Sequence, residues 1–192
     1  MLYGKRIRLR RDERSDLPIF VDWLNDPDVR RYLSTFLPTS QAAEEQWFEN
    51  MLKRPPDEQP FGIEIRDGDG WRLIGNCGFF DINWRTRSAE VGLFIGDKSC
   101  WNMGYGTEVM RLLLRHGFGT LNLNRIFLHV DVDNKGGIRA YQKAGFVHEA
   151  RLREADFRDG KYFDELIMSV CIRNGFPEVR QKNGSIKQTK LV

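Results

Sequence analysis

The sequence predicts an α/β fold with a mixed sheet, and three observations support this class. The chain has 192 residues, 41% of them hydrophobic, which suits one domain with a sizeable core. Segments with apolar residues at every second position, typical of strands, alternate with segments of helical period. Over 89–133 a strand, a helix and a strand follow one another, which predicts two parallel neighbours joined by a right-handed crossover.

The first half of the chain predicts a strand, helical regions and a hairpin. Residues 5–11 alternate apolar and basic side chains, as in a half-buried strand. Residues 15–33 predict a helix, a turn at Pro27 and a short second helix, and residues 39–54 predict a helix that prolines end. Residues 61–84 predict two strands about the turn "DGDG".

The second half alternates strands with helices. Residues 89–97 and 124–133 predict strands, and the stretch between them predicts a helix with a continuous apolar stripe. Residues 134–145 predict a helix that ends at a glycine, and two last strands, around 146–156 and 162–172, flank the turn "RDGK". The predicted order is therefore β-α-α-β-β-β-α-β-α-β-β. The apolar stripe consists of Met110, Leu113, Leu114, Gly117, Phe118 and Leu121.

Composition narrows the location and the chemistry. No apolar stretch approaches the roughly 18 residues of a membrane span, and the N-terminus has no apolar signal region, so no membrane is expected. Three widely spaced cysteines argue against a disulfide framework and suit the reducing cytoplasm. The three histidines show no metal-ligand spacing with Cys or Glu, so no metal is expected.

Charge is concentrated at the C-terminus. Residues 173–192 hold five Lys or Arg and one Glu, whereas the whole chain has a net charge of +3. We therefore expect one domain over 1–173 and a basic, flexible tail over 174–192, with contact to an acidic partner such as RNA as the alternative. Nucleic acid is not the expected partner, and the oligomeric state stays open, with a homodimer among the options.

Two glycines stand one residue apart where strand 89–97 leads into the next helix. Glycine loses more backbone entropy on folding than any other residue, so Gly104 and Gly106 are expected there only if φ is positive or a group approaches the backbone closely. Free N–H groups and the positive end of the helix dipole favour an anion at this place. A P-loop string is absent, and a dinucleotide fingerprint lacks its third glycine at Val109. A diphosphate loop of the coenzyme A type and a tight turn without a ligand remain.

Two motifs and the end of the chain carry a resemblance. The pattern [Q/R/W]-x-x-G-x-[G/A] is matched by Trp101, Gly104 and Gly106. The pattern N-x-x-[S/A/G]-x-x-x-Y-x-K-x-G-F is matched by Asn134, Gly137, Tyr141, Lys143, Gly145 and Phe146, and "GKYFDELIMSV" matches a third, at the end. Over about residues 5–172 the chain resembles the GNAT acetyltransferase superfamily, in the branch of ribosomal-protein-alanine and spermidine N-acetyltransferases. It departs from the family at Met103, where a basic residue is common.

The resemblance implies a GNAT fold in which acetyl-CoA lies in a splay between strands 89–97 and 124–133. The pantetheine arm would pair with the backbone of 93–95, and the diphosphate would accept N–H groups from about 102–107. The side chain of Asn134 would hold the splay or a cofactor amide, and its alternative role is to cap the next helix. The implied cofactor-binding residues are Leu93, Phe94, Ile95, Asn102, Met103, Gly104, Tyr105, Gly106, Thr107, Asn134 and Lys143.

Two catalytic residues are expected. Tyr141 lies on the family motif as the general acid toward the coenzyme A sulfur, and its alternative is a core tyrosine. Glu90 is the candidate base, on the strand face opposite Val91, and its alternative is a strand-end carboxylate paired with Arg85 or Arg87. The expected reaction is direct attack by a primary amine on acetyl-CoA in a ternary complex, the amine being a protein N-terminus, a polyamine or another small amine. The alternative is a catalytically idle acyl-CoA-binding regulatory module.

The acceptor side is expected to be formed by the first two helices and the last hairpin, as in the family that the chain resembles. The residues predicted to line it are Tyr32, Phe36, Asp156, Phe157 and Tyr162. A satellite core is the alternative for each of them.

Overall fold

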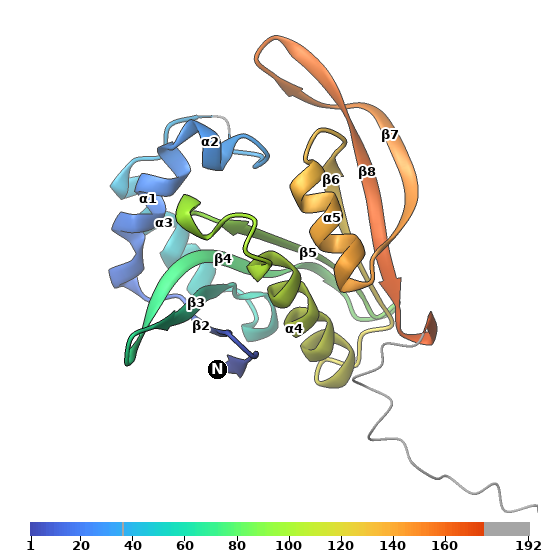
Figure 1. Cartoon of the computed structure of the whole chain (residues 1–192), viewed down its shortest axis with the longest axis horizontal. Helices are drawn as coiled ribbons and strands as arrows, with labels where there is room; N and C mark the ends of the chain where they lie inside the picture. Colours follow the sequence, from blue (N-terminus) through green and yellow to red (C-terminus); the bar gives the residue numbers. More distant parts are fainter. Residues whose placement is uncertain (36, 175–192) are drawn as a thin grey trace, which may run out of the picture.

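The computed structural model describes residues 1–35 and 37–174, which form an eight-stranded mixed sheet (Figure 1). The strand order is β1-β2-β3-β4-β5-β6-β8-β7, and all neighbours are antiparallel except β5 and β6. The predicted α/β class and the crossover between parallel strands are thereby confirmed. The strands are β1 Leu2–Tyr3, β2 Ile7–Arg11, β3 Phe61–Asp67, β4 Gly70–Asn83, β5 Ser88–Ile95, β6 Arg125–Asp131, β7 Val147–Arg158 and β8 Lys161–Cys171.

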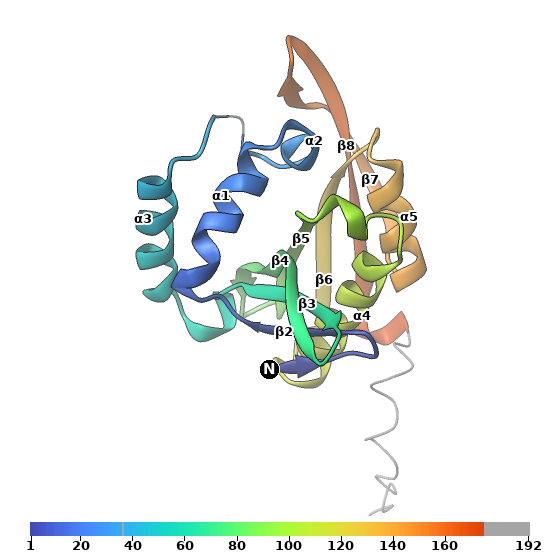
Figure 2. The same cartoon turned by 60° about the vertical axis from the view of Figure 1, so that its left-hand side comes forward.

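Helices cover both faces of the sheet. In Figure 2, α4 and α5 lie on one side of the sheet and α1 and α3 on the other. The α-helices are α1 Leu17–Asn25, α2 Pro27–Arg30, α3 Gln41–Leu52, α4 Tyr105–Gly119 and α5 Lys135–Ala144. The short 3₁₀ helices are Arg14–Asp16, Pro56–Glu58, Lys98–Cys100 and Ile172–Asn174. The predicted division into a domain over 1–173 and a tail over 174–192 stays a prediction, since residues 175–192 lie outside the described residues.

The structure differs from the predicted order near the N-terminus. A two-residue strand, β1, precedes the predicted first strand and pairs with it, Leu2 opposite Leu9. The short second helix predicted after the turn at Pro27 is present as α2, although the predicted order counts it together with the first helix; the side chain of Asp26 accepts a hydrogen bond from the backbone N–H of Asp28 at 2.9 Å and starts α2 at Pro27. A side-chain cap followed by proline at the first position is a strong helix start, so the chain turns there.

Helix α4 packs its apolar stripe on the centre of the sheet. Met110, Leu113 and Leu114 are fully buried there. Gly117 allows close approach, because a Cβ atom at this position would lie 2.6 Å from Cδ1 of Ile126 on β6. The predicted stripe is therefore confirmed, and it fixes the start of α4 relative to the parallel strands.

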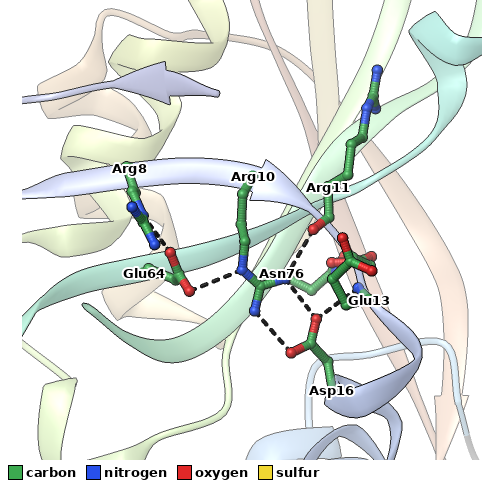
Figure 3. A network of polar contacts seen from close by, with 8 residues as sticks. Arg8, Arg10, Arg11, Glu13, Asp16, Glu64 and Asn76 are labelled. Atoms are coloured by element: carbon green, nitrogen blue, oxygen red, sulfur yellow. Dashed lines mark hydrogen bonds and ion pairs between the residues drawn. The ribbon is translucent and has the colours of Figure 1, made fainter. Parts of the chain in front are cut away.

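An ion-pair network fastens the first helix to the sheet (Figure 3). The guanidinium of Arg10 on β2 donates to both carboxylate oxygens of Asp16, at 2.6 and 2.8 Å, just before α1. Its Nε also donates to Glu64 on β3 at 2.8 Å, and Arg8 donates to the same carboxylate at 2.5 Å. Bidentate arginine pairs of low exposure hold geometry well, so this network sets where α1 begins over the sheet.

The two parallel strands pair over a short length and then part. Residue pairs form at Ser88 with Arg125, Ala89 with Ile126 and Glu90 with Phe127. Beyond Glu90, strand β5 continues beside β4, and β6 continues beside β8. The predicted splay is therefore present, with its wide end at the carboxyl ends of both strands.

Candidate active site

A cleft of about 1160 Å³ opens where β5 and β6 part. One side, which we call the loop side, consists of loop 102–107 and helix α5. The other side carries acidic residues from α3 and from the sheet face opposite α4, and we call it the acidic side. Its carboxylates are Glu44, Glu90, Asp131 and Glu165.

The two glycines of loop 102–107 occupy their positions for different physical reasons. Gly104 precedes α4 with φ of 84°, a left-handed conformation that favours glycine. At Gly106 a Cβ atom would meet nothing closer than 4.0 Å, from Ala140 and Leu93. A tight turn thus accounts for Gly104. At Gly106 neither packing nor φ demands glycine, and its absence of a side chain leaves the backbone open toward the cleft.

The neighbours of this loop anchor it at both ends. Trp101 donates from Nε1 to the carbonyl of Ile95 at 2.8 Å, which fastens the loop to the end of β5. Thr107 donates from its hydroxyl to the carbonyl of Ala140 on α5 at 3.3 Å. Met103 is 55% exposed, so its side chain adds no charge and little packing. Asn102, with φ of 61°, and Tyr105 also line the cleft.

The predicted strand segment at the end of β5 lies along the cleft. Its residues pair with β4 on one edge, Leu93 opposite Cys77 and Phe94 opposite Asn76. The other edge has left β6, so its backbone groups face the opening. The carbonyl of Ile95 already accepts the bond from Trp101, which leaves the edge at Leu93 and Phe94 as the freer part.

Tyr141 is both a core residue and a lining residue. Its side chain, from α5, is 9% exposed, packs near the Phe146 ring at 6.0 Å and borders the cleft. Its hydroxyl has no hydrogen-bond partner among residues 1–35 and 37–174. Burial raises the pKa of Tyr141 to about 12, so the group stays protonated near neutral pH. The two interpretations of this tyrosine therefore do not exclude each other.

Glu90 lies on the acidic side at the point where the strands part. Burial raises its pKa above the ordinary carboxylate value, with His129 opposing and Asp81 and Glu165 reinforcing the shift. His129 lies close to Glu165, with 3.2 Å between Nδ1 and Oε2. Within the described residues Glu90 has no ion pair, so the alternative pairing with Arg85 or Arg87 is wrong; Arg87 instead donates to Asn122 at 3.2 Å.

Asn134 and Lys143 mark the two ends of α5 in the cleft. The Oδ1 atom of Asn134 accepts from the backbone N–H of Gly137 at 2.8 Å, which is the helix-cap geometry. That bond leaves its Nδ2 atom as the group that could serve a ligand. Lys143 is exposed, and its ammonium makes no contact within the described part of the chain. Gly145 ends the helix at φ of 111°, as predicted.

The sequence analysis missed most of the acidic side. Glu44 is 6% exposed, lines the cleft and has no side-chain partner within residues 1–35 and 37–174. Burial raises its pKa. Asp131 is 8% exposed, and its Oδ2 accepts from Arg158 while its Oδ1 has no partner among the described residues. Glu44 looks like an ordinary surface residue of an amphipathic helix in the sequence, so no local signal identifies it.

The predicted acceptor residues divide into two groups. Tyr32 and Asp156 line the cleft, and the Tyr32 hydroxyl lies 3.4 Å from the carbonyl of Asp133, across the opening. Phe157 and Tyr162 instead pair with each other near the hairpin turn, with ring centroids 4.9 Å apart, and do not line the cleft. They flank the turn at 159–160 of the β7–β8 hairpin, which extends past the other strands of the sheet in Figure 1. Phe36 lies outside the described residues.

Arg158 joins the hairpin to both sides of the opening. It donates to the carbonyl of Arg31 at 2.5 Å, pairs with Asp131 and lies over the Tyr32 ring at 5.3 Å. The hairpin, α2 and the end of β6 therefore meet above the cleft. Arg158 therefore holds the hairpin against α2 and β6 at the opening of the cleft.

Two further observations concern the described residues alone. Within 1–35 and 37–174, no group of three His, Cys, Asp or Glu side chains is placed to hold a metal ion. Over the same residues, the helices are too short or too polar to span a bilayer. The three cysteines are free, two of them buried.

Comparisons with known proteins agree on one protein family. A family model described as an acetyltransferase (GNAT) domain matches residues 6–147. An uncharacterized N-acetyltransferase, p20, from Bacillus licheniformis is 30% identical over 174 residues, 90% of this chain and 96% of the relative. A spermidine N(1)-acetyltransferase from Vibrio cholerae is 30% identical over 171 residues, 84% of this chain and 90% of the relative. A crystal structure of the spermidine N-acetyltransferase from Vibrio cholerae with CoA and spermine superimposes with a TM-score of 0.79 and 28% identity, covering 86% of this chain and 95% of that one.

Proposed function

Because this chain belongs to the GNAT acetyltransferase family, we propose that it transfers the acetyl group of acetyl-CoA to a primary amine by direct attack in a ternary complex. The observation that carries the proposal is the parting of β5 from β6, with loop 102–107 and Tyr141 on the same cleft. Parted parallel strands leave backbone donors and acceptors free for an extended ligand, as in the addition of a strand.

The residues of the loop side fit the parts of acetyl-CoA, which supplies a thioester that an amine can attack. The N–H groups at the start of α4 suit the diphosphate, and Gly106 leaves them accessible. The free edge of β5 at Leu93 and Phe94 suits the amides of the pantetheine arm. Lys143 and Arg139, which are exposed on α5 and line the cleft, suit the phosphates.

Glu90 acts as the base in this proposal. An amine with a pKa near that of lysine, about 10, is almost fully protonated at neutral pH and must lose a proton before it attacks. The raised pKa of Glu90 makes its carboxylate a better proton acceptor than an exposed one. Glu90 takes the proton directly or through one water, and the neutral nitrogen then forms the bond to the acetyl carbon.

Tyr141 acts as the acid. When the carbon–sulfur bond breaks, the departing thiolate needs a proton or a strong hydrogen bond. The Tyr141 hydroxyl has no competing partner among the described residues, and its pKa of about 12 keeps it a donor. The reaction balances: one proton leaves the amine, one reaches sulfur, one carbon–nitrogen bond forms and one carbon–sulfur bond breaks.

The acidic side favours a cationic acceptor. Two buried carboxylates, Glu44 and Asp131, and the half-buried Glu90 lie in one region, and Glu44 has no positive partner among the described residues. A second ammonium group on the substrate would compensate this charge. We therefore place small di- and polyamines first among the acceptors, consistent with the activity named for the Vibrio cholerae relative, and protein N-terminal amines second.

The location and assembly are part of the same proposal. Free cysteines suit the reducing cytoplasm. We expect no membrane or nucleic-acid partner, and a homodimer is an assembly to test by light scattering.

A two-part experiment tests the function. Calorimetry with CoA and acetyl-CoA measures binding, and release of free thiol is then followed with diamines, polyamines, dipeptides and acidic amines. We expect thiol release with cationic amines and intersecting initial-rate lines, as a ternary complex requires. Binding without thiol release from any amine would favour the idle acyl-CoA-binding module. The absence of heat at millimolar CoA would overturn the proposal.

A further inference from the structure

The segment between β1 and β2 contacts the outer surface of loop 102–107. Arg6 donates from Nη1 to the carbonyl of Met103 at 3.1 Å. Its guanidinium lies over the Tyr105 ring, 4.6 Å from the centroid. Its Nε and backbone N–H donate to the two carboxylate oxygens of Glu108, at 2.9 and 2.6 Å. The Arg6 side chain thus contacts Met103 before α4, Tyr105 at its first residue and Glu108 in its first turn.

These contacts determine how the loop peptides point. In a trans peptide the C=O and N–H groups point in opposite directions, and no peptide among the described residues is cis. Arg6 holds the Met103 carbonyl toward itself, so the N–H of Gly104 points the other way. Gly104 borders the cleft, whereas Arg6 lies outside the cleft lining that the described residues form. The N–H therefore faces the cleft because Arg6 holds the carbonyl away from it.

Arg6 also neutralises an unfavourable charge. Glu108 lies in the first turn of α4, where its carboxylate would repel a diphosphate bound at the same helix start. Burial opposes ionisation of Glu108, but the hydrogen bonds from the Arg6 backbone and side chain outweigh it and lower the pKa, so the carboxylate stays charged. With Arg6 present, the pair carries no net charge toward the loop.

We infer that Arg6 is a positioning residue for diphosphate recognition, which aims the loop N–H groups into the cleft and cancels the charge of Glu108. The inference rests on the proposed function and goes beyond it, since Arg6 lies 97 residues before Met103 and does not line the cleft. Arg6 reaches the loop through the backbone carbonyl of Met103, so the contact does not depend on the side chain at that position.

The chain offers a matched control. Arg115, two turns further along α4, donates from Nη2 to the carbonyl of Tyr3 at 2.6 Å. It therefore ties the same N-terminal segment to the same helix, without contact to loop 102–107. Loosening of the segment alone would affect Arg6→Ala and Arg115→Ala alike.

The experiment measures Kd for CoA, dephospho-CoA and pantetheine, and kcat and KM for acetyl-CoA, in full-length wild type and variants. We expect Arg6→Ala to weaken CoA and dephospho-CoA alike by about tenfold, the loss of one charge-assisted contact, with kcat at saturation within about twofold. Binding of pantetheine, which lacks the diphosphate, stays unchanged. Arg115→Ala leaves all three affinities unchanged, and Arg6→Lys recovers part of the loss.

A double variant separates the two roles of Arg6. In the Arg6→Ala background, Glu108→Gln removes the uncompensated carboxylate and should restore about threefold of the CoA affinity. Thermal unfolding of each variant checks that the fold is retained, which the exposed position of Arg6 favours. If Arg6→Ala and Arg6→Lys leave CoA affinity unchanged, or weaken pantetheine equally, the inference is overturned. If wild type binds no CoA, the proposed function itself has failed.

Discussion

The two sides of the cleft are built from different parts of the chain and by different means. The loop side comes from two nearby stretches, loop 102–107 and helix α5, and presents backbone N–H groups at a helix start together with side chains of α5. The acidic side gathers Glu44 from α3, Glu90 from β5 and Glu165 from β8, which are far apart in sequence. The comparison suggests a division of labour in the proposed function. Acetyl-CoA would be bound mainly by backbone groups, which require few particular side chains. The acceptor amine would be selected by side chains that only the tertiary fold brings together.

The largest expected effect comes from Tyr141, the proposed acid on the loop side. Tyr141→Phe removes the hydroxyl and keeps the ring packing, so kcat should fall by about 10²-fold while CoA affinity changes little. Steady-state kinetics and calorimetry check both parts. Tyr162→Phe is the control, because Tyr162 is 65% exposed and away from the cleft. Unchanged turnover of Tyr141→Phe would remove this residue from the mechanism.

The next effect tests Glu90, the proposed base, which lies where β5 and β6 part. Glu90→Gln should lower kcat/KM at neutral pH by about tenfold or more and move the acidic limb of the pH–rate profile toward alkaline pH, where the amine loses its proton in solution. In wild type, activity should fall as pH drops through the raised pKa of Glu90. An identical profile in the variant would assign proton removal to another group.

A smaller effect sharpens the contrast between the sides. Glu44→Gln should raise KM for a diamine by about three- to tenfold and leave KM for acetyl-CoA unchanged, because Glu44 comes from α3 and not from the loop side proposed to bind acetyl-CoA. The KM for a monoamine of the same length should rise less in this variant. Glu45→Gln, an exposed neighbour on α3, is the matched control. Equal losses for monoamine and diamine would contradict a role in binding a second cation.

The smallest effect concerns how the stability of the fold depends on pH through the buried residue Asp12. Burial raises the pKa of Asp12 to about 7, although Asn76 donates to its Oδ2 at 2.7 Å, and its Oδ1 has no partner within the described residues. The folded protein therefore keeps a proton that the unfolded chain loses near its ordinary pKa of about 3.9. Stability of wild type should decrease as pH rises from about 4 to about 7 and then level off.

Asp12→Asn should remove that loss. Its Tm should match wild type near pH 4 and exceed it increasingly up to pH 7, by about 2–4 °C for each kcal/mol. Thermal unfolding at several pH values measures the difference, with Asp69→Asn in the exposed hairpin turn as control. A Tm difference that does not depend on pH would show that Asp12 is ionised in both states.

The sequence was informative where local rules decide the structure. The periodicity of 105–119 predicted α4, and Gly145 predicted the end of α5, because capping and burial act within one element. The alternative roles at Asn134 and Tyr141 needed the structure, which shows that a helix cap or a core position can also border the cleft.

Residues that act across long separations could not be predicted. Glu44 is buried because α3 packs beside α1, and neither helix shows this in its own sequence. Arg6 and Glu108 are 102 residues apart and meet because the segment between β1 and β2 lies against the start of α4. The alternative pairing of Glu90 with Arg85 or Arg87 is not formed, because Arg87 donates to Asn122 and Arg85 is exposed in the turn before β5.

The short junction between β5 and β6 has a mechanical consequence. Three residue pairs join the two halves of the sheet along these strands. A molecule that bonds to the free edges above Glu90 would lengthen this junction and stiffen the whole sheet, and its binding would raise the melting temperature by mass action. Backbone amides in the upper part of β5 should then exchange with deuterium more slowly, while those in β3 keep their rates.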